Sequence, residues 1–354
     1  AVTTYKYNSD FLGYTGVGAI PIGMANPDLK WQTTKKFNVG ITSSFLGDRL
    51  NVNLDVYNEK TIDMLIDRSL PPSSGTTSVK ANLGSQTSNG IEFSVWGKII
   101  RTKDWEWTLS VNGLHSKTTI NNISEAMKRM NEQNATGYTD GSVSVASSSP
   151  LFQYREGESP TAIYAVRSAG IDPATGREIF IKQDGSYTYT YDTKDQVACG
   201  DTNPVMQGSF SSMLQYKNFS LTASFQYRFG GKMYNSTRAL KVENINPRQN
   251  CDVRAFTDRW TKPGDVKPYI DIANATGNTS VYTDRFVEKD NELWLSSLYL
   301  QYNVPVTFLR KIHVQKLYVG IGTEDLFRIT SAKYERGTSY PYSRSVNMSA
   351  SLTF

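Results

Sequence analysis

The chain has few of the features from which catalysis, metal binding or nucleic-acid binding is usually inferred. No apolar run approaches the roughly 20 residues that a membrane-spanning helix needs. Lys and Arg total 38 against 33 Asp and Glu, and they are scattered singly, so the net charge of +5 does not indicate a nucleic-acid partner. Residues that favour helices are also scarce. These absences direct attention to strands.

Histidine and paired carboxylates are equally sparse. His115 and His313 are the only histidines, and neither has a cysteine or carboxylate at ligand spacing, so we expect no metal site. Glu156 and Glu158 lie in a polar stretch and are interpreted as a solvated patch rather than the paired carboxylates of a glycoside hydrolase. We therefore predict no catalytic residue, no cofactor and no enzymatic activity.

What the chain does contain is an apolar residue at every second position. In residues 48–57, DRLNVNLDVY, the apolar Leu50, Val52 and Leu54 interleave with polar residues, which is the periodicity of a strand with one apolar and one polar face. Whole-chain hydropathy can stay low in a barrel built from such strands. The pattern predicts nine strands. The alternation that marks each of them is seen in residues 37–41, 48–57, 91–95, 105–111, 210–216, 219–229, 298–304, 317–321 and 346–354.

The connections between these strands alternate in length. Short links lie at Gly47–Asp48, 101–104, 217–218 and 305–312, and long ones at 60–88, 117–207, 231–292 and 325–341. Up-and-down membrane barrels have short periplasmic turns and long outer loops, so this alternation predicts that topology. Counting back from Phe354 places every short link on the periplasmic side.

A soluble all-β sandwich or barrel is the alternative, since its strands alternate too. Three observations favour the membrane barrel. Four connections reach about 15 residues or more, which is uncommon in compact domains. Aromatic residues gather beside the short turns, as an interfacial girdle requires: Phe45, Trp105, Trp107, Tyr216 and Phe219. The last strand has a single apolar phase like that of barrel insertion signals: Val346, Met348, Ala350, Leu352 and Phe354.

The long connection 117–207 has two local signals of its own. Turn residues at 172–176 and at Asp184–Gly185 predict a small hairpin within residues 171–191. Residues 124–131, SEAMKRMN, predict a short helix with Ser124 as its N-cap, and it is interpreted as a solvated turn without a functional role.

Seven stretches spread over nearly the whole chain resemble the SusC/RagA group of TonB-dependent transporters of Bacteroidota. They occur in the order of that family and end at the terminal Phe: NPDLKW (26–31), LDVYNEKTIDML (54–65), NGIEFSVWG (89–97), GIDPATGREIF (170–180), DTNPVMQGSFSSMLQYKNFSL (201–221), RWTKPGDV (259–266) and YPYSRSVNMSASLTF (340–354).

The resemblance implies an all-β fold, the C-terminal half of an antiparallel transmembrane barrel of about 22 strands with long extracellular loops. Residues 1–354 would form one partial barrel domain. The plug domain, the TonB box and the first half of the barrel are not recognised in it, and AVTTYKYNSD has no export signal. We therefore expect a fragment or a processed chain, since an open sheet would leave unpaired edges in lipid.

The resemblance implies that the protein takes part in the import of a large nutrient across the outer membrane of a Gram-negative bacterium. A SusD-like lipoprotein captures the ligand, and the TonB complex supplies energy through the missing part of the transporter. The ligand would be an oligosaccharide or an oligopeptide, with glycan as the first expectation. A secreted, soluble all-β protein that binds carbohydrate without transport is the alternative function.

Four tryptophans and two cysteines are the remaining candidates. Trp96 is out of phase with Phe93 and Val95, so it is expected to face the lumen, where it could stack on a ligand or pack against the plug. Trp31, Trp260 and Trp294 lie in or near the outer loops, where contact with the SusD-like lid, loop packing and interface anchoring are the alternatives. Ligand contact is also considered for Trp31 and Trp260. The last pair, Cys199 and Cys251, could form a disulfide between two outer loops or remain free thiols.

Overall fold

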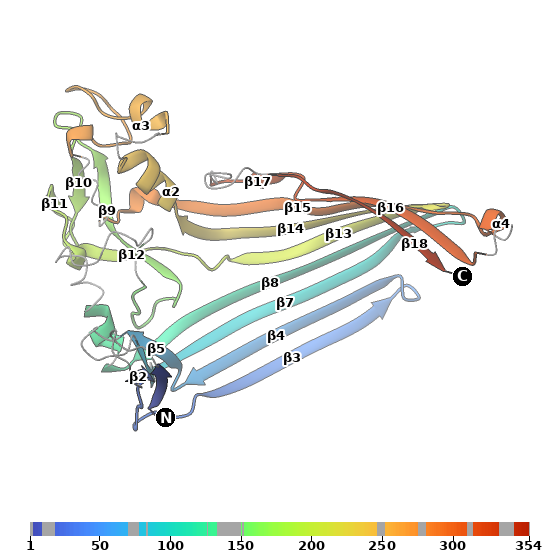
Figure 1. The fold of residues 1–354 in the computed structure, drawn as a ribbon, viewed down its shortest axis with the longest axis horizontal. Helices are drawn as coiled ribbons and strands as arrows, with labels where there is room; N and C mark the ends of the chain where they lie inside the picture. Colours follow the sequence, from blue (N-terminus) through green and yellow to red (C-terminus); the bar gives the residue numbers. More distant parts are fainter. Residues whose placement is uncertain are drawn as a thin grey trace.

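A computed structural model describes residues 3–8, 18–69, 78–82, 84–125, 127–132, 150, 152–245, 252–274, 281–309, 314–332 and 343–353. Its largest unit is an antiparallel sheet of ten strands in the order β18-β16-β15-β14-β13-β8-β7-β4-β3, with β17 pairing with β15 (Figure 1). The strands are β3 (Thr33–Phe45), β4 (Leu50–Ile62), β7 (Gly84–Arg101), β8 (Trp105–Ile123), β13 (Met206–Tyr216), β14 (Phe219–Tyr234), β15 (Val287–Asn303), β16 (Lys316–Glu324), β17 (Arg328–Thr330) and β18 (Val346–Thr353).

All nine predicted strands are confirmed, and each pairs with its neighbour in the chain in the order expected for an up-and-down sheet. Several strands run further than predicted. The start of β7 and the end of β8 fall inside segments expected to be loops. Near these ends, Thr61 and Ile120 are 4% and 2% exposed because loop residues cover them. The apolar alternation is lost there although backbone pairing continues. The sequence pattern therefore predicted strands that are shorter than the observed ones.

The register aligns like with like across the sheet. On one face, paired neighbours form an apolar row from β4 to β15: Val52, Val95, Val111, Phe210, Phe225 and Leu295. The opposite face carries a largely polar row, one residue along each strand from the apolar row and two residues along β15, where the register shifts: Asn51, Trp96, Ser110, Ser211, Ser224 and Ser297. Because successive side chains of a strand point to opposite faces, the period-two pattern has become a two-sided sheet. These two surfaces are called the apolar face and the polar face below.

The short links gather at one end of the sheet and the long connections at the other (Figure 1). The β3–β4 turn places Leu46, Gly47 and Asp48 at φ values of 55°, 63° and 62°, and the β13–β14 link is the pair Lys217–Asn218. Left-handed backbone matches the twist of the flanking strands in tight hairpins. The β15–β16 link contains a short helix, α4 (Val306–Leu309).

Aromatic side chains form a row beside the short turns. Register places Trp105 opposite Tyr216, Tyr216 opposite Phe219, and Phe219 opposite Tyr302. The rings of Trp105 and Tyr216 lie 4.3 Å apart, and those of Phe219 and Tyr302 lie 4.7 Å apart. These side chains share the apolar face, where aromatic girdles of membrane barrels stand.

The long connections fold into a layer of their own at the other end of the sheet. Residues 162–201 form a four-stranded sheet, β11-β10-β9-β12. Its strands and the other elements of this layer are β9 (Ala162–Ile171), β10 (Glu178–Ile181), β11 (Tyr187–Thr188), η3 (Thr193–Asp195), β12 (Gln196–Asp201), α2 (Ser236–Arg238), η4 (Ala239–Glu243), α3 (Arg254–Thr257), η5 (Ile272–Asn274) and η6 (Asp284–Phe286).

Two local predictions in this layer are confirmed. Strand β10 pairs with β9 and with β11, so residues 171–191 form the expected hairpin and the chain turns at Gly176 and Gly185 with positive φ. Residues 125 and 127–132 are helical, and Ser124 caps them, because its Oγ accepts a hydrogen bond from the Met127 backbone N–H at 3.3 Å.

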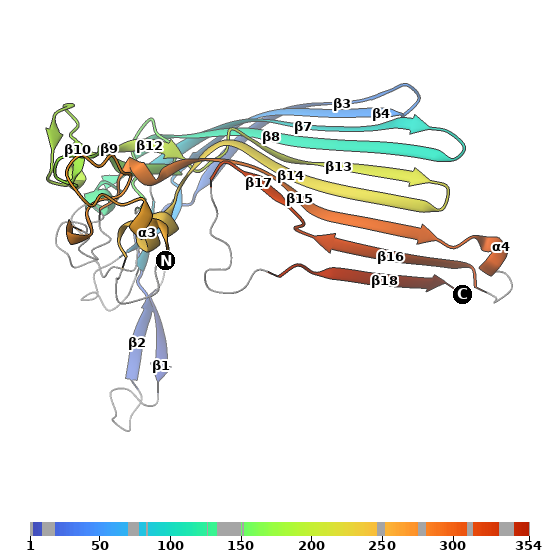
Figure 2. The same cartoon turned by 90° about the horizontal axis from the view of Figure 1, so that it is seen from above.

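Two more hairpins complete the described fold. They are β1 (Thr4–Asn8) with β2 (Gly18–Gly23), and β5 (Leu65–Ser69) with β6 (Ser78–Asn82). Figure 2 shows the β1–β2 hairpin projecting away from the large sheet.

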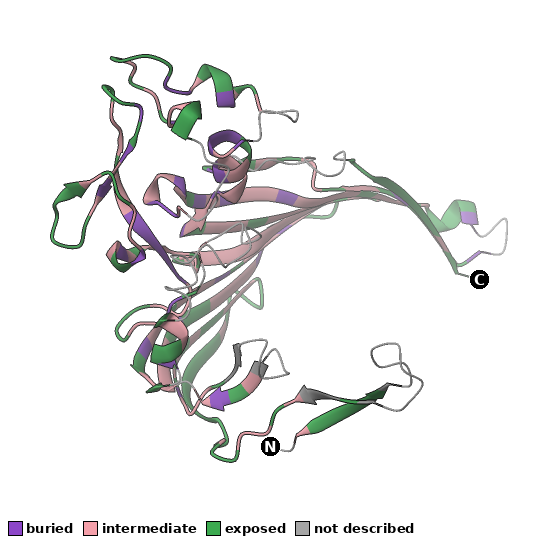
Figure 3. Ribbon diagram, turned by 60° about the vertical axis from the view of Figure 1, so that its left-hand side comes forward, coloured by how far each residue is buried: buried purple, intermediate pink, exposed green. Residues whose placement is uncertain are grey.

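The main buried cluster lies in the loop layer rather than against the large sheet. It is formed by Ala239, Val242, Ile245, Ala255, Tyr269 and Phe286. The apolar face, in contrast, stays open, with side chains such as Phe37, Ile41 and Met348 exposed by 69%, 62% and 81%. Figure 3 shows this division, with purple segments concentrated near the loops. No helix among the described residues is long and apolar enough to cross a membrane, a finding that concerns helices alone.

Candidate functional site

The polar face of the sheet carries the first candidate site. A hollow of about 450 Å³ lies over β4, β7, β8 and β13. Register brings Asp55 opposite Glu92, and Asn53, Ser94 and Asn112 side by side in the next row. Such a surface offers hydrogen-bond acceptors and donors to a polar partner, and Phe93 and Leu114 add apolar contacts.

Trp96 stands on this polar face, aligned with Asn51 on one side and Ser110 on the other. The Lys98 ammonium lies 5.8 Å from the Trp96 ring centroid and 3.1 Å from the Glu106 carboxylate. The position of Trp96 on the polar face agrees with the phase expected from the sequence. Contact between Trp96 and a ligand stays a prediction.

The other tryptophans occupy unlike surroundings. Trp31 is 89% exposed, in the stretch just before β3. Trp260 is only 8% exposed, and its Nε1 donates a hydrogen bond to the Pro173 carbonyl at 2.9 Å, which favours the loop-packing alternative. Trp294, on the polar face of β15, has the Arg328 guanidinium 5.2 Å from its ring centroid.

A buried ion network ties three strands of the large sheet together near the end where the long loops begin. The Arg228 guanidinium on β14 lies 3.0 Å from both Asp290 and Glu292 on β15, and the Arg328 guanidinium on β17 lies 2.7 Å from the Glu292 carboxylate. Glu292 is 2% exposed. This network holds β17 along β15 at the end of the sheet where the long loops begin. The sequence analysis missed it because the paired residues are 36 to 64 positions apart in the chain.

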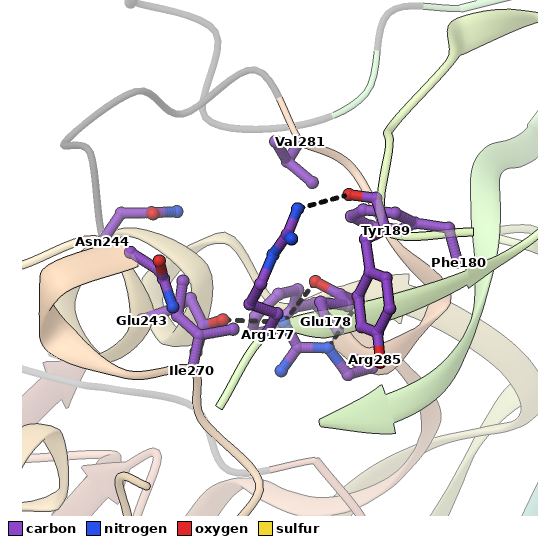
Figure 4. Close-up of a pocket in the computed structure, with 11 residues that line it drawn as sticks. Arg177, Glu178, Phe180, Tyr189, Glu243, Asn244, Ile270, Val281 and Arg285 are labelled. Carbon is purple, nitrogen blue, oxygen red and sulfur yellow. Dashed lines mark hydrogen bonds and ion pairs between the residues drawn. The ribbon is translucent and has the colours of Figure 1, made fainter. Parts of the chain in front are cut away.

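The second candidate site is a pocket of about 230 Å³ inside the loop layer (Figure 4). It lies between the β10–β11 hairpin and the segments around Glu243, Ile270 and Arg285. Its lining residues are Arg177, Glu178, Phe180, Tyr189, Glu243, Asn244, Ile270, Asn274, Val281, Arg285 and Phe286. Two long connections of the barrel therefore meet at this loop pocket.

Arg285 ties the two connections together at the pocket floor. Its Nε and Nη2 donate to the two oxygens of Glu178 at 2.6 and 2.7 Å, and Nη2 also donates to Glu243 at 2.7 Å. Burial lowers the pKa of the Arg285 guanidinium, but the two carboxylates outweigh burial and hold that pKa above its usual value. Burial raises the pKa of Glu243, against the opposing effect of Arg285.

A second buried arginine supports the same floor from below. Arg259 is 3% exposed and donates to the carbonyl oxygens of Val242, Glu243, Ala255 and Ile270 at 2.5 to 2.8 Å. Arginine suits this role because its planar fork has five donors. Arg259 and Glu178 stand inside two of the stretches that carried the family resemblance, which was the available signal for this site.

Cys199 lies in β12 with a free, partly buried thiol, whose Sγ is 3.4 Å from the Val197 carbonyl oxygen and 3.5 Å from that of Ala165. Cys251 lies outside the described residues, so the proposed pairing stays a prediction.

Burial raises the pKa of the Cys199 thiol to about 11. Since the thiolate is the nucleophile, we expect iodoacetamide to label Cys199 very slowly at pH 8 and progressively faster toward pH 11. Mass spectrometry of peptides labelled at graded pH measures this, with glutathione as the reference thiol. Labelling at pH 8 as fast as glutathione would contradict the buried position.

The residues considered for chemistry have structural partners. His115 Nδ1 lies 2.5 Å from the Val205 carbonyl oxygen, and the Glu156 carboxylate accepts from the Ile123 backbone N–H at 3.1 Å. His313 and Phe354 lie outside the described residues. Within the described ranges no group of three His, Cys, Asp or Glu side chains is placed to hold a metal ion.

Comparison with known proteins agrees with this architecture. The family model described as "TonB dependent receptor-like, beta-barrel" matches residues 3–150. TonB-dependent receptor P3 of Formosa agariphila is 25% identical over 328 residues, which cover 88% of this chain and 31% of that protein. TonB-dependent receptor SusC of Bacteroides thetaiotaomicron is 27% identical over 220 residues, covering 59% of this chain and 20% of SusC.

Among solved structures, the RagAB peptide transporter has a chain that superposes with a TM-score of 0.73 at 22% identity, covering 94% of this chain and 35% of its own. The RagAB importer in its open-open state gives a TM-score of 0.74 at 22% identity, covering 100% and 38%. These likenesses show the fold. This chain spans about a third of the length of the first two curated relatives it matches.

The fold class is therefore that of an antiparallel transmembrane β-barrel with long loops, and the sheet is open because the chain forms only part of the barrel. More narrowly, residues 3–150 match the TonB-dependent receptor β-barrel family, and the chain is similar to part of the TonB-dependent receptors P3 and SusC.

Proposed function

We propose that this chain supplies wall and outer loops to an outer-membrane transporter that imports a large nutrient with energy from TonB. The observation that carries the proposal is the two-sided sheet. Its apolar face stays uncovered along ten strands, while its polar face and the loop layer offer hydrogen-bonding and charged groups. An apolar exterior around a polar interior is the arrangement that a lipid-embedded, water-containing passage requires.

The rest of the transporter is the first partner in this proposal. Within the described residues, β3 and β18 each pair on one side only, so both edges expose backbone N–H and C=O groups. In lipid such groups must be paired, and further strands of the same transporter would pair them. The plug, and the segment that TonB pulls, would belong to that remaining part too.

A SusD-like surface lipoprotein is the second proposed partner, and an oligosaccharide is the first proposed substrate class. RagAB is a peptide transporter, which keeps oligopeptide as the second class. The loop layer supports a capture role, because its buried core and ion pairs hold a large, defined surface at the end of the sheet.

Fractionation and uptake test this function on the full-length protein. We expect it to sediment with outer membranes and to require detergent for extraction. We also expect cells lacking it to lose uptake of oligosaccharides of several residues, and loss of TonB to have the same effect. Parallel uptake of oligopeptides distinguishes the two substrate classes.

The same partition experiment tests the competing function, a secreted carbohydrate-binding protein. A secreted carbohydrate-binding β-protein would remain in the aqueous fraction without detergent, and the apolar stripes would then be covered by another protein layer. Finding the full-length protein soluble in that way would refute the transporter.

A further inference from the structure

The loop pocket has features of a binding site that transport alone does not require. Its walls include the buried aromatic rings of Phe180 and Phe286, which are 6% and 2% exposed. Tyr189, 43% exposed, stands at its rim, and Arg177 reaches across its mouth (Figure 4). The volume of about 230 Å³ suits a single sugar or amino-acid unit rather than a whole oligomer.

Arg177 is held in place by its neighbours. Its guanidinium carbon lies 4.8 Å from the Tyr189 ring centroid, and its Nη2 lies 3.5 Å from the Tyr189 carbonyl oxygen. Tyr189 is fixed in turn, since its hydroxyl donates to Asp172 at 2.8 Å. Asp172 also accepts from Thr175 Oγ1 at 2.6 Å and from the Ala174 backbone N–H at 3.0 Å. A stacked and supported guanidinium loses little freedom when it binds a ligand.

The charges below Arg177 are already balanced. In the buried floor Arg285 pairs with the carboxylates of both Glu178 and Glu243, and a second cation, Arg259, donates to the backbone carbonyl oxygen of Glu243. Arg177 is therefore the cation at the mouth with donors to spare, and its other N–H groups have no hydrogen-bond partner in the part of the chain that the structure describes. Such a fork matches the two oxygens of a carboxylate.

The floor adds a complementary acceptor. Glu243 is 3% exposed, and its Oε2 has no hydrogen-bond partner among the described residues, whereas its Oε1 accepts from Arg285. A buried acceptor without a donor is costly, so a donor that enters beside it stabilises the site. A ligand with a carboxylate at one end and a hydroxyl or ammonium group at the other would satisfy both ends of the pocket.

We propose that the loop pocket binds one carboxylate-bearing unit of the imported nutrient. Arg177 would pair with the carboxylate, the aromatic walls would contact the body of the unit, and its hydroxyl or ammonium group would approach Glu243. An acidic sugar and the carboxylate of a peptide share this chemistry. The inference rests on the proposed import function and makes it more specific, because it predicts an anionic nutrient.

Binding to the full-length transporter in detergent tests the pocket. The sugar probes are trigalacturonate and neutral galactotriose, and the peptide probes are N-acetyl-tri-alanine with a free carboxylate and its neutral C-terminal amide. We expect one acid to bind at least roughly tenfold more tightly than its neutral counterpart. The preferred pair of probes identifies the source of the carboxylate.

Variants locate the effect. Arg177→Gln should weaken binding of the preferred acid by roughly tenfold and leave the neutral probe unchanged. Arg177→Lys, which keeps the charge but not the fork, should recover part of the affinity. Tyr189→Phe should weaken the acid less than Arg177→Gln, because it keeps the ring and loses the bond to Asp172. Lys262→Gln removes one exposed positive charge from the other long connection of the loop layer and should change nothing.

Two results would overturn the proposal that the loop pocket binds a carboxylate-bearing unit. One is equal affinity for acid and neutral probes in both pairs, and the other is unchanged affinity for the acid in Arg177→Gln. Uptake measured on the same variants separates this failure from that of import itself. If cells with Arg177→Gln import a neutral nutrient normally while acid binding is unaffected, the import function is retained and the proposed carboxylate site is refuted. If wild-type cells import nothing, import itself is refuted.

Discussion

Arginine in place of Phe210 is expected to destabilise the full-length barrel by about 2–4 kcal/mol, the cost of a cation on the lipid face near the bilayer centre. Phe210 lies on the apolar face and its ring stacks on Phe225 at 4.5 Å. It stands six residues from Tyr216, in the aromatic row. At about 3.3 Å per residue and a strand tilt of about 40°, that separation is roughly 15 Å, close to half of the apolar band of about 25 Å.

Ser211→Arg is the matched control, one residue further along the same strand and on the polar face. There the new guanidinium meets water or polar side chains, so we expect a much smaller loss. Urea unfolding in detergent or lipid, followed by heat-modifiable mobility on gels, measures both variants. Equal destabilisation by the two changes would mean that the face assigned to lipid is wrong.

Methionine in place of Arg285 is expected to release the loop layer. Glu178 and Glu243, 8% and 3% exposed, would lose the cation that they share, and breaking a buried pair in this way costs about 3–5 kcal/mol. Because the large sheet has its own hydrogen-bond ladder, the loss should be local. Hydrogen exchange should speed up in β10 and in residues 239–245 while amides in the middle of β13 and β14 keep their protection.

Lys128→Met provides the exposed comparison, since it breaks the solvent-exposed contact between Lys128 and Glu125, and it should leave exchange unchanged. A combined variant, Arg285→Met with Glu178→Leu and Glu243→Met, removes all three charged groups and should restore much of the protection. If Arg285→Met alone leaves exchange in β10 as it was, the ion pairs do not hold the two loops together.

The strands were predictable because their cause is local. Alternation such as that of Leu50, Val52 and Leu54 indicates which side of a strand is apolar. The short turns around Gly47 and Lys217 indicate which strands are neighbours. The seven family stretches gave the architecture in the same way, by order along the chain. None of this required knowledge of distant contacts.

The loop layer was predictable only in pieces. The hairpin of residues 171–191 and the cap at Ser124 arise from neighbouring residues and were anticipated. The pairing of Arg285 with Glu178, 107 positions away, was not. Trp260 shows the same limit, since its partner Pro173 is 87 positions distant and no periodicity relates the two.

The sequence by itself thus determined a two-faced, up-and-down sheet and its family, since period-two burial and turn residues act within a few positions. Only the tertiary structure decided how two long connections combine into one layer, which arginines are buried, and that Arg177 and Tyr189 meet over an aromatic pocket. The joining of the two connections depends on contacts such as Trp260 with Pro173 and Arg285 with Glu178, whose partners are 87 and 107 positions apart. Local pattern carries no record of such distances.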